Sequence, residues 1–457
     1  MTNRLDRDFH LPGLLRFALP TIIMMLVVSL YTIVDGVLIA RLVGENALAA
    51  ANVAYPAISF TLAMGIMLGT GGSAVVAHKM GAGYLEEARR DFGFLALVAV
   101  CIGLAVCLAG ALFAGPLARL LGASDLLLDD TVTYLRVQLC FAPMAMLQLL
   151  FESFFVTAGR PGLGLGLATA AGVTNAVLDY LYMGPMQMGI LGAALGTVTG
   201  YSIPAVVGVL FFLLRRQGLR FGRPHGDLRM LGRACFNGAS EMVTNLSMAV
   251  TTFLFNAIMM AYLGEAGVSA ITIVLYAQFL LVSLYMGFSM GVAPVFSFNR
   301  GAGRYDRMRR IFGYCLRFIL VSSVAILAVA LALSGVVVGI FSTPGSQVYA
   351  IALDGFRRFA PAFLFAGVNI FSSALFTALS DGRTSAIISF ARTFGFLLLG
   401  LLLLPRLLEV DGVWLAVPLA ELLSCLLSVW FLRRKRADFG FGGGDLPRHG
   451  GRGGGRT

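Results

Sequence analysis

Long apolar segments, separated by short polar stretches, follow one another along almost the whole chain. A membrane-spanning helix needs roughly 20 mainly apolar residues, and segments of that length recur throughout the sequence. The expected spans are 14–39, 47–76, 92–115, 132–157, 163–183, 189–214, 235–262, 268–297, 311–341, 355–379, 385–404 and 412–432. This pattern predicts an all-α integral membrane protein with twelve transmembrane helices.

The composition agrees with this prediction. Of the 457 residues, 58% are hydrophobic and only 12% are charged, whereas soluble proteins average about 45–50% apolar and about 25% charged residues. A water-soluble domain of this size could not bury so much apolar surface, but a bilayer covers it. The composition therefore excludes soluble enzymes, secreted disulfide scaffolds and disordered chains.

The basic residues lie mainly on one side of the predicted bundle. When the N-terminus, the even-numbered loops and the C-terminus are assigned to one side, all but six of the 34 Lys and Arg residues fall there. The exceptions are Arg41, Arg119, Arg136, Arg357, Arg358 and Arg406. Because loops rich in Lys and Arg stay in the cytoplasm, we expect a multi-pass protein of the bacterial inner membrane with both termini cytoplasmic. The same rule explains the net charge of +11, so the charge indicates no nucleic-acid partner.

The two halves of the chain resemble each other at an offset of about 220 residues. Gly44 aligns with Gly264, and the Gly-Ala-Gly triplet at 81–83 aligns with the one at 301–303. Six spans per copy give both copies the same orientation, and such parallel repeats place substrate sites at their interface near mid-membrane. We expect two six-helix lobes around a central cavity, an arrangement typical of a transporter.

The repeats and the polar breaks divide the chain into five parts. These are a cytoplasmic N-terminus at 1–13, an N-lobe at 14–214, a basic cytoplasmic linker at 215–234, a C-lobe at 235–432 and an Arg- and Gly-rich tail at 433–457, which we expect to be disordered.

Three motifs carry a family resemblance. YTIVDGVLIARLVG lies in the first span, GTGGSAVVAHKMGAG closes the second, and SMGVAPVFSFNRGAG repeats the latter in the second half. With the two six-span repeats, they resemble the multidrug and toxic compound extrusion (MATE) family from about Leu14 to Leu432. The resemblance implies a secondary antiporter that exports organic, often cationic, compounds in exchange for Na⁺ or H⁺. It implies no cofactor, and we expect a monomer whose partners are small amphipathic substrates and membrane lipid.

Acidic residues inside the predicted spans are candidates for function. A charged side chain at the bilayer centre costs at least about 2.5–3.5 kcal/mol on insertion scales. Five acids lie within the spans, namely Asp35, Glu152, Asp179, Glu241 and Glu421.

Two of these acids form the predicted cation-coupling site. Asn175 precedes Asp179 by four residues, so both side chains lie on one face of the fifth span. Given the expected orientation, Asp35 lies at a similar depth in the first span, and Thr197 of the sixth span adds a hydroxyl. These oxygens suit a small hard cation such as Na⁺, or a carboxylate pair that shares a proton. We expect no other metal.

The resemblance points to the same four positions, because one branch of the family has such an Asp, Asn, Asp and Thr set in its N-lobe. The alternative is that the two acids are polar packing groups satisfied by neighbouring amides and hydroxyls.

Glu241 is the corresponding candidate in the C-lobe. Other branches of the family use an acid in span 7 for coupling, together with an Asp in span 10, where this chain has Asn369. Glu241 is therefore either a second acid that attracts cationic substrates or a helix N-terminal residue favoured by the helix dipole. For the two remaining acids we expect ion pairs, Glu152 with Arg160 or another basic loop residue and Glu421 with Arg392.

Other residues complete the predicted transport machinery. Pro20 removes a backbone hydrogen bond inside the first span and is a candidate hinge, although a static kink is the simpler interpretation. The candidate cavity-lining residues are Tyr31, Asn52, Gln138, Tyr276, Gln278 and Asn369.

Two other functional classes remain as alternatives. A flippase for a lipid-linked precursor, or an exporter of one specific metabolite, would belong to the same superfamily. The flippase would need a strongly basic cavity, and the mid-span arginines are few. An integral-membrane enzyme would need clusters of acids or histidines, whereas the four histidines are isolated. We therefore predict that the protein is not an enzyme.

Overall fold

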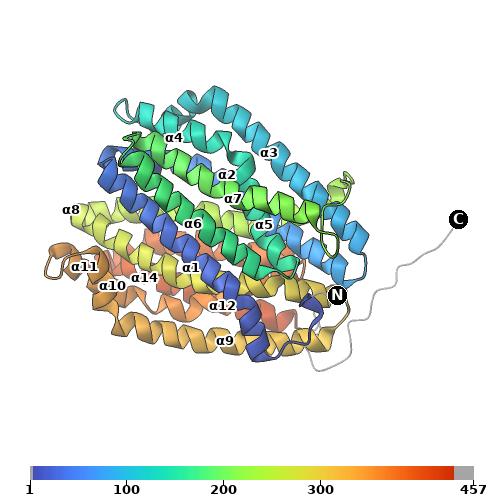
Figure 1. Cartoon of the computed structure of the whole chain (residues 1–457). Helices are drawn as coiled ribbons and strands as arrows, with labels where there is room; N and C mark the ends of the chain where they lie inside the picture. Colours follow the sequence, from blue (N-terminus) through green and yellow to red (C-terminus); the bar gives the residue numbers. More distant parts are fainter. Residues whose placement is uncertain (1–3, 437–457) are drawn as a thin grey trace.

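The computed structural model describes residues 4–436, and the described chain is helical throughout apart from turns and connections (Figure 1). A short 3₁₀ helix, Arg4–Asp6, precedes the first long helix. The first half contains α1 (Leu11–Leu42), α2 (Glu45–Gly81), α3 (Leu85–Leu120), α4 (Leu128–Cys140), α5 (Ala142–Thr157), α6 (Pro161–Met183) and α7 (Gly189–Leu214). The second half contains α8 (Leu228–Gly301), α9 (Tyr305–Ala332), α10 (Ser334–Phe341), α11 (Gln347–Phe359), α12 (Ala362–Ala378), α13 (Gly382–Phe390), a π-helical segment (Ala391–Leu397) and α14 (Leu398–Arg434). Residues 437–457, which include most of the expected disordered tail, lie outside the described part of the chain.

The helices account for twelve membrane spans. Eight helical segments are long and apolar enough to cross a membrane, and two further spans are bent pairs, α4 with α5 and α11 with α12, each bent by 55°. Two of the eight segments are each too long for one crossing, because 74 or 53 residues far exceed the roughly 20 that span a bilayer. They break at Gly264 and at Glu409, where the backbone φ angle turns positive. Each therefore supplies two spans, and the predicted number of twelve is confirmed.

The break at Gly264 is a feature of the internal repeat. Gly264 has a φ of 63°, and its sequence equivalent Gly44 has a φ of 123° directly before α2. A residue without a Cβ adopts such angles readily. The same kind of turn therefore separates the first two spans of each half.

The helix boundaries differ from the expected ones where the chain leaves the apolar region. α3 begins at Leu85 rather than near 92, and α8 begins at Leu228 rather than near 235. Asp227 caps α8, since its carboxylate accepts hydrogen bonds from the backbone N–H groups of Arg229 and Met230. Hydropathy detects only the part of a helix that lies in hydrocarbon, so it misses polar turns that continue the helix into the headgroup region.

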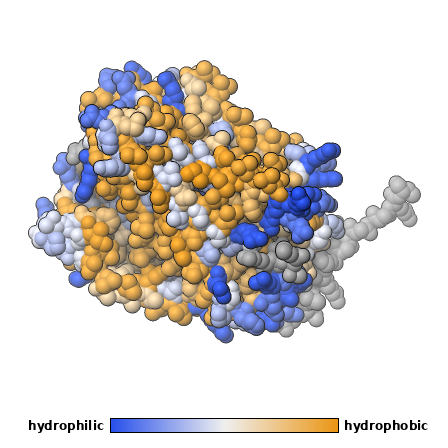
Figure 2. Space-filling view, viewed as in Figure 1, coloured by the Kyte–Doolittle hydropathy of each residue, from blue (hydrophilic) through white to orange (hydrophobic). Residues whose placement is uncertain are grey.

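One end of the bundle carries most of the charged side chains; we call it the basic end. It contains the last turns of α2, α7 and α8 and the first turns of α3, α9 and α13. The N-terminal segment is held there, because Asp6 forms ion pairs with Arg304, the residue directly before α9, and with Arg307 of α9. At the other terminus Lys435 pairs with Asp381. Figure 2 shows hydrophobic residues over the side of the bundle and hydrophilic residues gathered toward its ends.

The expected linker at 215–234 is partly packed onto the N-lobe. The ring of Phe221 stacks on Phe92 of α3, with centroids 4.9 Å apart, and the backbone N–H of Gly222 donates to the carbonyl oxygen of Arg89 at 3.0 Å. The first part of this segment is therefore a fixed element of the N-lobe surface.

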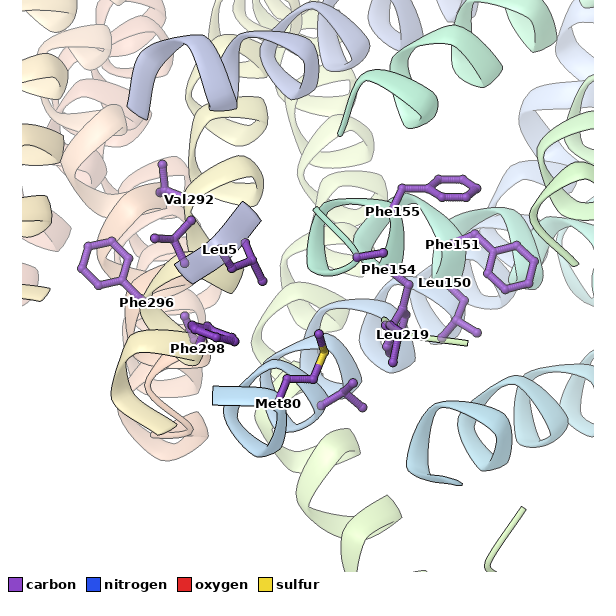
Figure 3. Close-up of a cluster of buried hydrophobic side chains, with 14 of the residues drawn as sticks. Leu5, Met80, Leu150, Phe151, Phe154, Phe155, Leu219, Val292, Phe296 and Phe298 are labelled. Atoms are coloured by element: carbon purple, nitrogen blue, oxygen red, sulfur yellow. The ribbon is translucent and has the colours of Figure 1, made fainter. Parts of the chain in front are cut away.

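The buried hydrophobic residues form one core that both halves share at the basic end. This cluster combines Phe151, Phe154 and Phe155 of α5 with Val292 and Phe296 of α8 (Figure 3). Two further clusters are confined to one half each, one over residues 39–194 and the other over residues 255–417. The two lobes are therefore joined at the basic end, and toward the other end each has a hydrophobic core of its own.

Two glycines that are equivalent in the repeat bring the lobes into backbone contact. A methyl group at Gly81 would overlap the carbonyl oxygen of Phe298, and one at Gly301 would overlap the carbonyl oxygen of His78. These glycines belong to the repeated Gly-Ala-Gly triplets, so the sequence repeat marks the place where α2 and α8 meet.

A second pair of glycines makes a similar contact between α2 and the first part of α8. A methyl group at Gly71 would overlap the carbonyl oxygen of Ala234, and one at Gly238 would overlap that of Met67. Close backbone approach through small residues is how helices associate in membranes. The basic end is therefore closed by contacts that leave no space for a side chain.

Replacing Gly81 or Gly301 by Ala should open this closure. The added methyl group has only partner backbone to meet, and overpacking of this kind costs about 1–3 kcal/mol. We expect a larger population with the lobes apart at the basic end. The measurement is the distance between nitroxide labels at positions 90 and 233 in a cysteine-free background.

Gly313→Ala is the matched control, since a methyl group at Gly313 of α9 meets nothing within 4 Å. An unchanged distance distribution in both Gly81→Ala and Gly301→Ala would contradict a closure that depends on these glycines.

Candidate functional site

Asp35 of α1 and Asp179 of α6 meet inside the N-lobe. Their carboxyl groups lie within hydrogen-bonding reach of each other, and the side chain of Asp179 is fully buried. Two carboxylates that both carry a charge repel each other at this distance. The contact is therefore stable when the pair holds one proton or when a cation lies between the two groups.

Within residues 4–436, Asn175 is the amide donor to this pair. Its Nδ2 donates to Oδ2 of Asp179 at 2.8 Å, across one turn of α6. The other oxygen of that carboxylate, Oδ1, and Oδ1 of Asp35 are buried and accept no hydrogen bond from residues 4–436. Buried polar atoms usually have partners, so these two oxygens are free to bind a proton or a small cation.

Small residues of α7 make room for the pair. A methyl group at Gly196 would overlap Oδ1 of Asp179, and one at Gly200 would lie 3.3 Å from Cβ of Asn175. Thr197 follows Gly196 directly, but its hydroxyl donates to the carbonyl oxygen of Ala193 at 3.0 Å. The structure thus brings Asp35, Asn175 and Asp179 together, while Thr197 lies beside them with its hydroxyl bonded to its own helix.

Two tyrosines that the sequence reasoning missed stand close to the pair. Tyr134 of α4 is buried close to Gln138, and it lies near enough to both aspartates for electrostatic interaction. Tyr201 of α7 interacts in the same way with Asp35. In the sequence, Tyr134 and Gln138 are four residues apart, as are Asn175 and Asp179. This spacing of polar residues on one helix face was the signal that could have identified Tyr134. Gln138 therefore belongs to the surroundings of the carboxylate pair.

Glu152 of α5 does not form the expected ion pair. In the described part of the chain, no basic group lies within 4.0 Å of its carboxylate, and Nε2 of Gln148 donates to it at 3.1 Å. Gln148 in turn lies close to Tyr31 of α1. The expected partner Arg160 is exposed at the start of α6, whereas Glu152 is buried among the phenylalanines of α5, so the pairing prediction was wrong.

The acid of the last span is neutralised as expected. Arg392 donates to Oε1 of Glu421 through Nε at 2.8 Å and through Nη2 at 2.6 Å. Asn369 donates to Oε2 at 2.7 Å, and its own oxygen accepts a hydrogen bond from Ser428. Because Asn369 is 1% exposed and both ends of its amide are engaged, it is not available to line a cavity in this conformation.

The other predicted site residues lie in several different parts of the structure. Glu241 is half-buried in the first part of α8 and lies close enough to Arg392 to feel its charge. Asn52 is exposed and Gln278 is half-buried. Tyr276 is 41% exposed and lines a cavity of about 580 Å³ beside the connection between α10 and α11.

Pro20 lies inside α1, which is helical from Leu11 to Leu42 without an interruption. The neighbouring turn is packed tightly, because a methyl group at Gly291 of α8 would overlap the hydroxyl of Thr21. α1 therefore links the carboxylate pair to the contact between the lobes, and a hinge at Pro20 remains a prediction.

Comparison with known proteins identifies the family of this fold and site. The sequence model of the MatE family matches the chain twice, at residues 20–181 and 242–402, once in each repeat. The multidrug export protein MepA of Staphylococcus haemolyticus is 23% identical over 428 residues, which is 92% of either chain.

Solved structures agree with this similarity. A MATE transporter in complex with MaL6 superimposes with a TM-score of 0.90 at 18% identity, over 96% of this chain and 99% of the other. An outward-facing multidrug resistance MATE transporter superimposes with a TM-score of 0.88 at 19% identity, over the same shares. Both show the twelve-helix, two-lobe fold. Since the family model covers most of the chain and matches each repeat, the protein belongs to the MATE family.

Proposed function

We propose that the protein is a secondary antiporter that exports organic, mainly cationic, compounds in exchange for Na⁺ or H⁺. The observation that carries the proposal is the buried pair of Asp35 and Asp179 in a two-lobe carrier that is closed at one end. Relatives along nearly the whole chain are named multidrug export proteins, which supports multidrug efflux and a transporter rather than an enzyme. The chain works as a monomer in the bacterial plasma membrane.

The carboxylate pair suits a proton or a monovalent cation. Within residues 4–436, no group of three or more His, Cys, Asp or Glu side chains could hold a metal ion, and the pair supplies at most two negative charges. A proton shared between the carboxyl groups, or a Na⁺ bound by their free oxygens and the nearby amide and hydroxyl oxygens, removes the repulsion.

Cation binding reaches the lobe interface through α1. The helix carries Asp35 in its second half, and its first half contacts the later part of α8, where a methyl group at Gly287 would lie 2.5 Å from the carbonyl oxygen of Thr21. A ligand shifts a conformational equilibrium only by its differential affinity for the two states. Loading the pair changes the packing of α1 against α6, and the contact of α1 with α8 passes this change to the other lobe.

The orientation follows from charge. The positive-inside rule puts the basic end, with both termini, in the cytoplasm. The lobes are then in contact on the cytoplasmic side, and toward the outside each has a hydrophobic core of its own, which supports a conformation from which an exported compound leaves to the outside. The return to the other state needs the glycine contacts at Gly81 and Gly301 to separate.

A flippase for lipid-linked precursors remains the second candidate, but the C-lobe disfavours it. Such a substrate carries a pyrophosphate that needs unpaired cations, whereas Arg392 is held by Glu421 at 2.6 Å. An exporter of one specific organic metabolite would use the same coupling site, so it is a narrower form of the proposal.

Replacing Asp35 or Asp179 by Asn should abolish coupling. The amide cannot share a proton with the remaining carboxylate and adds no charge for Na⁺. We expect gradient-driven efflux of a fluorescent organic cation from proteoliposomes to fall at least about tenfold, which equals ~1.4 kcal/mol of coupling free energy. Na⁺ and H⁺ gradients imposed separately identify the coupling ion.

Asp125→Asn is the matched control, because the side chain of Asp125 is 99% exposed in a loop. Efflux that stays gradient-dependent in folded Asp35→Asn protein would remove the site assignment. Absence of efflux in the wild-type protein under both gradients would contradict the export of organic cations.

Glu241 is proposed to attract cationic substrates. Glu241→Gln should raise the KM for a monovalent organic cation about fivefold, since the loss of one charge about 4 Å away is worth ~1 kcal/mol at the dielectric constant of water. Efflux of an uncharged amphipathic compound should change little. Glu265→Gln, at an exposed position of the same helix, is the control, and equal effects on charged and uncharged compounds would contradict this role.

A further inference from the structure

A groove lies on the lateral surface of the N-lobe at the basic end. It has a volume of about 400 Å³ and is formed where α7 ends and α6 begins. Its lining residues are Arg160, Val207, Leu210, Phe211, Leu214 and Arg215. We call it the Arg160–Arg215 groove. It has no part in the site described above.

One wall of the groove is apolar and faces outward. Val207, Leu210 and Leu214 have 36%, 48% and 73% of their surface exposed. They belong to the last two turns of α7, a helix long and apolar enough to cross the membrane. Exposed apolar side chains on a membrane-spanning helix contact lipid acyl chains.

The other end of the groove is basic and lies at the level where the spans end. Arg160 is the residue directly before α6, and Arg215 is the residue directly after α7. Both helix ends mark the boundary between the hydrocarbon and the headgroups. The groove therefore has the polarity of a phospholipid, with positive charge at headgroup level and an apolar wall below it.

The two guanidinium groups lack counter-charges. Neither lies within 4.0 Å of a carboxylate in the described part of the chain, whereas the nearby Arg89 is paired with Glu86. Arg215 donates through Nη2 to the carbonyl oxygen of Ala158 over a long 3.4 Å.

The Nη1 nitrogen of Arg215 also needs an acceptor. It is buried, and no acceptor for it is found within residues 4–436. Burial lowers the pKa of the Arg215 guanidinium, and the neighbouring positive charges of Arg160 and Arg89 lower it further. A bound anion in the groove would relieve the repulsion between the guanidinium groups of Arg160 and Arg215.

We propose that the Arg160–Arg215 groove binds an anionic phospholipid, with its phosphate between the two guanidinium groups and an acyl chain along α7. Basic pockets at the cytoplasmic ends of membrane helices are a known form of lipid recognition. A free phosphate ion would satisfy the arginines but leave the apolar wall without a partner, so both halves of the groove favour a lipid.

The test is a lipid titration of the purified full-length protein followed by native mass spectrometry. The probe is dioleoyl phosphatidylglycerol, and dioleoyl phosphatidylcholine is the zwitterionic comparison. We expect phosphatidylglycerol to occupy one tight site in the wild type. The Arg160→Gln/Arg215→Gln variant should bind it at least about tenfold more weakly, because each basic residue near a headgroup contributes ~1 kcal/mol.

A matched control removes the same charge outside the groove. Arg216 and Arg220 are exposed at the same end of the molecule, and Arg216→Gln/Arg220→Gln should bind phosphatidylglycerol as the wild type does. Leu210→Trp tests the apolar wall with no change of charge and should also weaken binding. It keeps the test decisive if the arginine variant fails to fold, which thermal denaturation detects.

Three results would overturn the proposal. The first is equal weakening in the groove and control variants, which indicates general electrostatics. The second is equal affinity for phosphatidylglycerol and phosphatidylcholine. The third is displacement of the lipid by excess inorganic phosphate, which indicates a site for free anions. None of them bears on the antiport proposal, because efflux does not enter the measurement.

Discussion

The cost of placing a carboxylate inside a bilayer organises the polar interior of this protein. The acids that the hydropathy pattern places in spans have different partners in the described chain, and Glu152 has the amide of Gln148 without a basic group. Glu421 accepts two hydrogen bonds from Arg392 and one from Asn369. Because these partners are side chains of the protein itself, the charge of Glu421 is permanently neutralised. Within residues 4–436, Asp35 and Asp179 have each other and the amide of Asn175 as partners, and we propose that a proton or a cation completes the arrangement.

The two lobes are therefore similar in backbone and different in chemistry. The family model matches both halves, and Gly44 and Gly264 turn the chain at equivalent points. The permanent ion pair lies in the C-lobe, and its Arg392 belongs to the π-helical segment Ala391–Leu397. Because π-helical turns inside helices often occur at functional sites, the position of Arg392 is consistent with a C-lobe that holds its charge in place.

Most of the architecture could be predicted from the sequence, because a bilayer imposes a strict length and polarity on each helix. The number of spans, the repeat and the pairing of Glu421 with Arg392 followed from hydropathy and spacing. Helix ends outside the hydrocarbon did not, and Asp227, the cap of α8, lies in a polar segment that hydropathy interprets as a linker. Side-chain direction was also out of reach, since sequence distance placed Glu152 near Arg160 but the two side chains point to different surroundings.

The same limit explains what was missed around the carboxylate pair. Tyr134 and Tyr201 come from α4 and α7, and their approach to Asp35 depends on how four helices pack, which no single helical pattern encodes. Two glycines of α7 allow this packing. Gly196 leaves room for one carboxylate oxygen, and Gly200 leaves room for Asn175. A helix that had to supply side chains at both positions could not approach α6 closely enough to enclose the pair. Close packing therefore leaves two carboxylate oxygens of the pair without a hydrogen-bond donor among residues 4–436.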